Sequence, residues 1–200
     1  MNQELICLAS ASPRRLQLLR QIGVCCEQRP VEVDETPLPG EAPADFVRRV
    51  ALDKATTGWR EGAGGRVVIG ADTAVVADGD ILGKPIDSRA AEAMLRRLSG
   101  RSHEVLTAVA AVLDGERECL LSASRVTFRP LADQEIRRYV ATGEPADKAG
   151  AYAIQGMAAV FVARLEGSYS GVMGLPLYET AMLLTRFGVN PFTPDPETAA

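Results

Sequence analysis

The sequence predicts an α/β domain built around a mixed sheet, and three observations lead to this class. Short apolar runs typical of buried strands alternate along the chain with amphipathic segments typical of helices. Two Asp-Gly pairs, Asp78-Gly79 and Asp114-Gly115, each separate neighbouring apolar runs, which indicates β-hairpins. The chain has 200 residues, of which 46% are hydrophobic, so it is long enough to fold as one compact domain without cross-links.

Extended segments are expected where apolar runs are bounded by Gly, Pro, Asn or Asp. In chain order they cover residues 5–9, 25–33, 66–76, 81–83, 104–113, 118–128 and 158–165. The two Asp-Gly turns join the third segment to the fourth and the fifth to the sixth. With only 5% aromatic residues, the core must consist mainly of Ala, Val, Leu and Ile.

Helices are expected where apolar residues recur with helical spacing and capping residues mark the ends. In chain order they cover residues 13–22, 44–57, 88–98, 133–141 and 176–187. Ser12 is a good N-cap for the first helix and Gly23 closes it, while Ser88 is expected to cap the third. The last helix carries more apolar residues than one face needs, which leaves a homodimer and ordinary core packing as alternatives.

Composition excludes several classes of function. The net charge of −4 and the pI of about 5.2 argue against electrostatic binding to nucleic acid or to an anionic membrane. The N-terminus does not resemble a signal peptide and no apolar stretch approaches the length of a membrane helix, so a cytoplasmic protein is expected. The four cysteines lack zinc-ligand spacing and are expected to be free thiols. Residues 191–200 have no apolar pattern and are expected to form a disordered tail.

The first candidate site is the run Ser10-Ala11-Ser12-Pro13-Arg14-Arg15 at a strand-to-helix junction. Two arginines in the first turn oppose the helix dipole, which is unfavourable unless an anion binds there. Backbone N–H groups and both guanidiniums would then point at that anion. The alternative is that the arginines reach back to surface carboxylates.

The second candidate is Asp72, which lies in the apolar run RVVIGADTAVV beside Gly70. A buried aspartate is costly unless it is paired, hydrogen-bonded or bound to a metal, and the glycine allows another group to approach closely. A divalent cation fits this position, whereas an aspartate that caps a turn is the alternative. Lys54 and Lys84 each read as solvated surface lysines when taken singly.

The third candidate is the polar segment 144–156, which is expected to be a loop and which a solvated connector would explain equally well. His103 is the only histidine, and without a Gly-x-Ser-x-Gly motif it is interpreted as structural. Neither Gly-x-x-x-x-Gly-Lys-[Ser/Thr] nor Gly-x-Gly-x-x-Gly occurs, so the sequence does not support the P-loop or the Rossmann mode of phosphate binding. These features alone predict an α/β domain with an anion site, without identifying a reaction.

Four motifs in this order resemble the Maf family of nucleotide pyrophosphatases. They are LASASPRR, GADTAVV with GKP downstream, EPADKAGAYAIQG and GSYSGVMGLPL, within a match from about Ile6 to Phe187. The last two motifs are most similar to the bacterial dTTP/UTP branch of the family. The resemblance implies a single domain over residues 1–190 with an elongated α/β fold, in which a central mixed sheet is flanked by helices and a cleft lies between two lobes. It also implies hydrolysis between the α- and β-phosphates with release of pyrophosphate.

The resemblance also implies roles for individual residues. The motif Ser-x-Ser-x-Arg-Arg falls on Ser10, Ser12, Arg14 and Arg15, with Arg14 contacting the triphosphate and Ser10 and Arg15 in support. Asp72 corresponds to the general base, and the remaining positions are Thr73 for specificity, Glu35 for the metal, Lys54 and Lys84 for phosphate charge, and Gln155 for the pyrimidine edge. The chain departs from many family members at Ser170, where they carry Asn.

The chemistry of these residue types agrees with such a reaction. Phosphoryl transfer depends mainly on positioning and charge stabilisation, which several cations and a divalent metal, Mg²⁺ or Mn²⁺, would supply. Asp72 would bind the metal, accept a proton from the attacking water, or do both. The ligand is expected to be a small nucleotide. Two alternatives remain open at this point: a nucleotide-binding regulator of cell division, and a family enzyme selective for 7-methyl-GTP.

Overall fold

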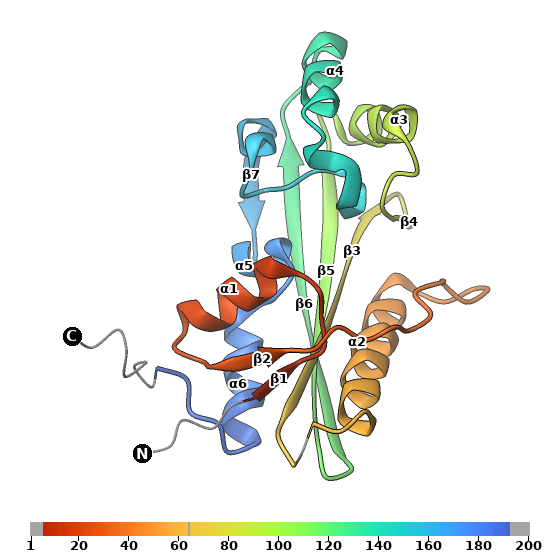
Figure 1. Ribbon diagram of the computed structural model, residues 1–200. Helices are drawn as coiled ribbons and strands as arrows, with labels where there is room; N and C mark the ends of the chain where they lie inside the picture. The colour runs from red at the N-terminus through yellow and green to blue at the C-terminus, as the bar shows by residue number, and fades with distance from the viewer. Residues whose placement is uncertain (1–5, 64, 193–200) are drawn as a thin grey trace.

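The computed structural model describes residues 6–63 and 65–192, and these form a central mixed sheet flanked by helices (Figure 1). The strands are β1 (Ile6–Leu8), β2 (Cys26–Gln28), β3 (Val68–Ala77), β4 (Asp80–Leu82), β5 (Ser102–Leu113), β6 (Glu116–Phe128) and β7 (Val162–Glu166). Their order in the sheet is β2-β1-β3-β5-β6-β7, and β4 pairs with β3. β1 is parallel to both of its neighbours and all other pairs are antiparallel. The predicted α/β class is therefore confirmed.

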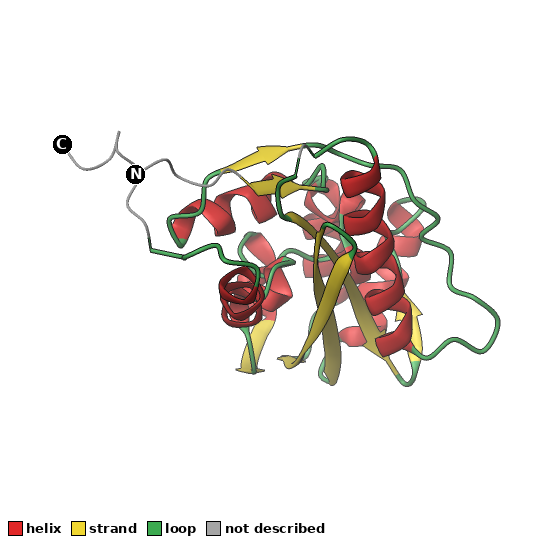
Figure 2. Ribbon diagram, turned by 90° about the horizontal axis from the view of Figure 1, so that it is seen from below, coloured by secondary structure: helices red, strands yellow, loops and turns green. Residues whose placement is uncertain are grey.

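Helices cover both faces of the sheet, as Figures 1 and 2 show. The α-helices are α1 (Pro13–Gln21), α2 (Pro43–Arg60), α3 (Ser88–Leu98), α4 (Asp133–Ala141), α5 (Tyr169–Met173) and α6 (Leu177–Arg186), and the 3-10 turns are η1 (Glu144–Asp147), η2 (Ala149–Ala151) and η3 (Met157–Phe161). In Figure 1 the long strands β3, β5 and β6 run the length of an elongated molecule. One lobe holds α3, α4 and β4, and the other holds α1, α2 and α6.

Both predicted hairpins are confirmed, and their turns have the expected backbone. Asp78 and Gly79 have φ angles of 53° and 85°, and Asp114 and Gly115 have 49° and 89°. Positive φ at both central residues is the signature of a type I′ turn, whose twist matches that of the paired strands. These turns set the register in which β3 pairs with β4 and β5 pairs with β6.

Several boundaries differ from the prediction. The N-cap of α3 is Asp87, whose carboxylate accepts a hydrogen bond from the Ala90 N–H at 2.7 Å, so the prediction of Ser88 is wrong. The strand expected over 158–165 begins only at Val162, because η3 occupies its first part. Of the extended segment 25–33, only β2 pairs in the sheet. Sequence reasoning also missed α5, a helix of one turn that Ser168 caps.

The packing beneath α2 differs from that on the opposite face. Several side chains that the sheet presents to α2 are small, among them Ala74, Ala108 and Ala110. The helix can therefore approach the strands closely. On the other face, large aliphatic side chains of α1 and α6 form the core, among them Leu19, Leu183 and Leu184. Leu177 and Phe187 of the last helix region also pack against this core, which favours ordinary packing, while the homodimer stays a prediction.

Two further predictions concern the ends and surface of the chain. Residues 193–200 of the predicted disordered tail lie outside the described residues. Among the described residues, no helix combines the length and apolar character needed to cross a membrane.

Candidate active site

A cleft of about 710 Å³ lies between the two lobes, and every site residue that the sequence predicts lines it. These residues are Ser10, Arg14, Arg15, Glu35, Lys54, Asp72, Thr73, Lys84 and Gln155. We call the side formed by β3, α2 and the segment 29–42 the lower wall. The side formed by the end of β4 and the turns over 144–157 is the upper wall.

Asp72 is the buried carboxylate of the lower wall. It lies in the middle of β3, pairs with Ala108 of β5 and is 7% exposed. Burial raises the pKa of Asp72, although the nearby Lys54 ammonium opposes that rise. The alternative that this aspartate caps a turn is wrong, because strand continues for several residues on both sides of it.

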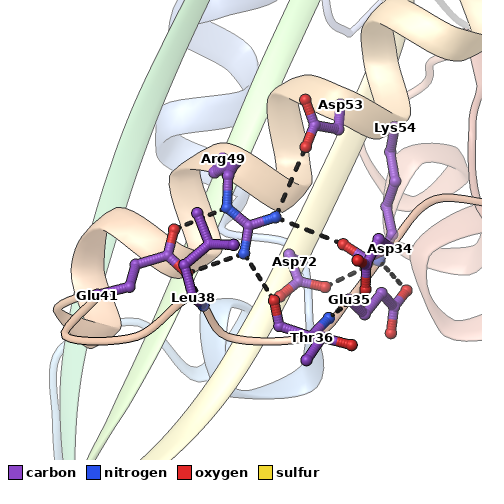
Figure 3. Close-up of polar contacts among 9 residues, drawn as sticks. All are labelled: Asp34, Glu35, Thr36, Leu38, Glu41, Arg49, Asp53, Lys54 and Asp72. Atoms are coloured by element: carbon purple, nitrogen blue, oxygen red, sulfur yellow. Dashed lines mark hydrogen bonds and ion pairs between the residues drawn. The ribbon is translucent and has the colours of Figure 1, made fainter.

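Lys54 joins Asp72 to the second carboxylate of the lower wall, Glu35 (Figure 3). Its Nζ lies 2.8 Å from Asp72 Oδ1 and 2.6 Å from Glu35 Oε1, and the residue is 8% exposed. Lys54 is therefore not the solvated lysine that its sequence position alone suggests. Burial works to raise the pKa of Glu35, but the hydrogen bond and charge of Lys54 outweigh it, so the pKa is lowered.

Gly70 explains how α2 comes close enough for this contact. A Cβ at Gly70 would lie 2.4 Å from the Ala51 carbonyl oxygen and 2.6 Å from the Ala55 nitrogen. Both atoms belong to the backbone of α2, so a side chain here would push the helix off the strand. The close approach expected at Gly70 is thus to α2, and it brings Lys54 within reach of Asp72.

The arginine-bearing loop at the start of α1 closes one end of the cleft. Arg15 donates from Nε to the Gly174 carbonyl at 2.8 Å and from Nη1 to Ser10 Oγ at 3.1 Å, and burial lowers its pKa. The alternative that both arginines reach surface carboxylates therefore fails for Arg15. Among the described residues, Arg14 has no hydrogen bond or ion pair, so its guanidinium is available to a ligand. Ser12 occupies the predicted N-cap, yet its side chain makes no capping bond.

The hydrogen bonds of the Thr107 and Thr73 hydroxyl groups determine whether Thr73 can donate to a ligand or accept from it. Thr107 Oγ1 donates to the Gly171 carbonyl at 2.8 Å and lies 3.0 Å from Thr73 Oγ1. Because the single hydroxyl hydrogen of Thr107 goes to Gly171, Thr73 must donate to Thr107. The Thr73 oxygen therefore faces the cleft only as a hydrogen-bond acceptor.

The upper wall is built from turns, which hydrogen bonds to the Glu144 carboxylate hold in place. Gln155 is exposed at a turn that Glu144 braces, since the Glu144 carboxylate accepts hydrogen bonds from Tyr139 Oη at 2.8 Å and from the Met157 N–H at 3.1 Å. A Cβ at Gly156 would lie 2.3 Å from Glu144 Oε2, so only glycine allows the carboxylate this position. The polar segment, predicted to be a loop, consists of short 3-10 turns held by hydrogen bonds, and it is not a loosely solvated connector.

Sequence reasoning missed two charged residues of the cleft, Asp147 and Lys148. They form an ion pair with each other. The hydrogen bond and charge of Lys148, and to a smaller extent the charge of Arg14, lower the pKa of Asp147. Both belong to the polar segment already singled out, and the adjacent opposite charges were the available signal. Lys84, on the same wall, is exposed as its sequence position suggests.

Ser170 and His103 have structural roles. Ser170 Oγ accepts a hydrogen bond from the Leu177 N–H at 3.0 Å, which satisfies a donor at the start of α6. His103 is buried with its Nε2 2.8 Å from Tyr152 Oη, and burial lowers its pKa to about 4. This agrees with the interpretation of His103 as a structural residue. Cys7, Cys26 and Cys119 are free thiols.

The lower wall can supply two oxygen ligands to a metal. Among the described residues, no group of three or more His, Cys, Asp or Glu side chains is arranged to hold an ion. Glu35 and Asp72, however, both lie within hydrogen-bond distance of one ammonium, so their carboxylates are near neighbours. Mg²⁺ typically binds one or two protein carboxylates and completes its coordination shell with water and substrate phosphates. The pair Glu35 and Asp72 fits this coordination.

Comparison with known proteins places the chain in a family. A sequence profile described as "Maf-like protein" matches residues 5–187. The dTTP/UTP pyrophosphatases of Aromatoleum aromaticum and Geobacter sulfurreducens are each 54% identical to the chain, covering 93% and 94% of it and 97% and 99% of their own lengths. That of Methylococcus capsulatus is 55% identical over 91% of this chain and 90% of its own. A solved structure of the Staphylococcus aureus Ham1 protein is 16% identical, with a TM-score of 0.46 over 64% of this chain and 72% of its own. The chain belongs to the Maf family.

Proposed function

We propose that this protein hydrolyses nucleoside triphosphates to the monophosphate and pyrophosphate, with dTTP and UTP as its preferred substrates. The observation that carries the proposal is the buried Asp72 carboxylate, held by Lys54 beside Glu35 in a cleft that cations line. The substrate assignment rests on the relatives named dTTP/UTP pyrophosphatase, which are about half identical to this chain over nearly its whole length.

The cations of the cleft suit the several negative charges of a triphosphate. They come from both lobes: Arg14, Arg15, Lys54, Lys84 and Lys148. Arg14 lacks a partner among the described residues, so binding a phosphate would not require it to break an existing bond. Its position in the first turn of α1 adds the positive end of the helix dipole to the same region.

Asp72 is the residue we assign as general base. Its ionised carboxylate would take a proton from the attacking water as the new P–O bond forms and the bond to the pyrophosphate leaving group breaks. Burial raises its pKa and makes it a stronger base than an exposed aspartate, while Lys54 favours the ionised form. A bound Mg²⁺ or Mn²⁺, held by Glu35 and Asp72, would neutralise phosphate charge.

Gln155 and Thr73 are assigned to recognition of the base and sugar. The Gln155 amide offers one acceptor and two donors, which match the hydrogen-bonding edge shared by uracil and thymine. Thr73 presents an acceptor to the cleft. A site built to hydrogen-bond one base rejects others, because the polar groups that the bound ligand covers would be left unpaired.

A cytoplasmic location belongs to the same proposal. Its support is that Cys7, Cys26 and Cys119 are free thiols, as is usual for proteins of a reducing compartment. No nucleic-acid partner is expected.

The test is pyrophosphate release from a panel of nucleoside triphosphates, including 7-methyl-GTP, with Mg²⁺ or Mn²⁺ for the wild type and Asp72→Asn. We expect dTTP and UTP to be turned over best, and the variant to lose about 10²- to 10⁴-fold in rate, the usual contribution of general acid–base catalysis. Thermal unfolding of the variant controls for misfolding.

Three outcomes would overturn parts of the proposal. Nucleotide binding without pyrophosphate release would favour a regulatory binding protein. Preference for 7-methyl-GTP would move the chain to another specificity within the family. Undiminished turnover by Asp72→Asn would mean that the general base lies elsewhere.

A further inference from the structure

Of the two lower-wall carboxylates that line the cleft among the described residues, Asp72 and Glu35, only Glu35 lies outside regular structure. Asp72 is fixed within β3 and Lys54 within α2, whereas the described residues 29–42 form neither helix nor strand. An irregular segment has no ladder of backbone hydrogen bonds to fix a side chain to within a fraction of an ångström. Something else must therefore place the Glu35 carboxylate 2.6 Å from the Lys54 ammonium.

The Arg49 side chain brackets Glu35 through the backbone on either side of it (Figure 3). Its Nη2 donates to the Thr36 carbonyl at 3.0 Å and its Nη1 to the Asp34 carbonyl at 3.4 Å. The Thr36 N–H in turn donates to Asp34 Oδ1 at 2.8 Å, which closes a turn around Glu35. One guanidinium thus binds the backbone carbonyls of the residues immediately before and after Glu35, Asp34 and Thr36.

The guanidinium is itself held in place. Arg49 Nε and Nη2 donate to the two oxygens of Glu41 at 2.7 and 2.8 Å, in the bidentate geometry that makes such pairs strong. The Glu41 side chain is only 9% exposed, and its Oε2 also accepts from the Leu38 N–H at 2.9 Å. The far end of the segment is therefore fixed to the same arginine.

Arg49 also shares an element with the residue that holds the Glu35 side chain. It precedes Lys54 by five positions on α2, which corresponds to about 7.5 Å along the helix axis. Arg49 holds the backbone of the segment, and Lys54 holds the carboxylate that the segment carries. Arg49 is not among the described residues that line the cleft, so any effect that it has on a substrate is indirect.

We propose that Arg49 is a positioning residue that sets the place of the Glu35 carboxylate beside Lys54 and Asp72, and that Glu41 fixes Arg49 for this purpose. The proposal rests on the proposed function for its kinetic consequence, because Glu35 is assigned there to the catalytic wall. It assigns Arg49 no contact with the nucleotide.

The kinetic test is a double-mutant cycle between Arg49→Ala and Glu35→Gln. We expect Arg49→Ala alone to lower kcat/KM for UTP by about 10- to 100-fold, the scale of a misplaced catalytic group. In the Glu35→Gln background the same change should have almost no further effect, because the residue that it positions is already disabled. Equal losses in both backgrounds would overturn the proposal.

Two variants on the same helix sharpen the test. Arg48→Ala is the matched control and should leave kcat/KM unchanged, since Arg48 is exposed and its one ion pair within the described part of the chain is with Asp45, at 3.6 Å. Arg49→Lys keeps the charge but loses the planar fork, and it should recover little of the lost activity. Full recovery with lysine would mean that charge alone matters and would contradict the positioning role.

A measurement without turnover separates this proposal from the proposed function. Hydrogen exchange at the Thr36 and Leu38 amides should accelerate in Arg49→Ala and not in Arg48→Ala. This holds whether or not the wild type releases pyrophosphate from any nucleotide. Unchanged exchange in Arg49→Ala would overturn the positioning role even if the enzyme acts as proposed.

Discussion

The two walls of the cleft are built in opposite ways. The lower wall carries buried charges, Asp72 and Lys54, on a central strand and a long helix whose backbones touch at Gly70. The upper wall carries exposed groups, Lys84 and Gln155, at a strand end and on a turn. Regular elements in direct contact can hold reacting groups to a narrow geometry, whereas turns allow adjustment to a ligand. The difference suggests that the lower wall performs the chemistry and the upper wall selects the nucleotide.

The largest difference between the walls should appear when one lysine is removed from each. Lys54→Met leaves Glu35 and Asp72 facing each other without the shared ammonium, so we expect a loss of about 3–5 kcal/mol in the free energy of unfolding, with loss of turnover. Lys84→Met removes an exposed side chain, and its effect on stability should stay within about 0.5 kcal/mol. Urea denaturation of both variants measures this, and equal losses would show that Lys54 is not a buried partner.

Two glycine substitutions should break the walls differently. Gly70→Ala drives a Cβ into the backbone of α2, so we expect it to cost about 1–3 kcal/mol of stability and to lower kcat by moving Lys54. Gly150 has φ of +66° and its Cβ would lie 2.8 Å from Val75 Cγ1, so Gly150→Ala should cost a similar amount and raise KM through the Lys148 turn. The split between kcat and KM, measured on variants that remain folded, is the readout. A rise in KM for Gly70→Ala together with a fall in kcat for Gly150→Ala would contradict the assignment of chemistry to the lower wall and nucleotide selection to the upper wall.

These contacts show where sequence reasoning stops. The Asp-Gly turns and the aspartate within an apolar run are local signals, so both hairpins and the buried Asp72 could be predicted. That Lys54 joins Glu35 to Asp72 depends on how α2 docks on β3, and the Thr73–Thr107 pair joins residues 34 positions apart. Neither contact can be predicted from the local spacing of residues. The resemblance to a family indicated most of these residues, but not the hydrogen bonds between them.

A smaller effect is expected from loosening the turn that carries Gln155. Glu144→Gln weakens the bonds to Tyr139 Oη and to the Met157 N–H, which together hold that turn. A loss of about 1.4 kcal/mol in one charged hydrogen bond would raise KM for UTP about tenfold, with kcat little changed. Steady-state kinetics test this. A fall in kcat at constant KM would instead connect the upper wall to the chemical step.

The smallest effect concerns acid stability and compares two arginine–carboxylate pairs. Hydrogen bonds from Arg49 and the Leu38 N–H lower the pKa of Glu41 from 4.5 to about 2, and Arg129 and the Ala132 N–H do the same for Glu135. A carboxylate with a lowered folded pKa stabilises the fold above pH 4.5, and this contribution is lost as the pH falls from 4.5 towards 2.

Glu41→Gln and Glu135→Gln should each flatten the dependence of unfolding free energy on pH within that window. Only Glu41→Gln should also lower turnover at neutral pH. Glu41 holds the arginine that brackets Glu35, whereas Glu135 holds Arg129, whose backbone partners, the Val160 and Pro130 carbonyls, do not line the cleft. Equal effects of the two variants on turnover would remove the distinction between the pairs.

The most direct test of the division between the walls compares kcat/KM for UTP and ATP in Glu35→Gln and Gln155→Ala. If the lower wall performs the chemistry, Glu35→Gln lowers both values by the same factor and leaves their ratio unchanged. If the upper wall selects the base, Gln155→Ala lowers the value for UTP far more than that for ATP, and the ratio falls. A ratio that changes in Glu35→Gln but not in Gln155→Ala would contradict this account.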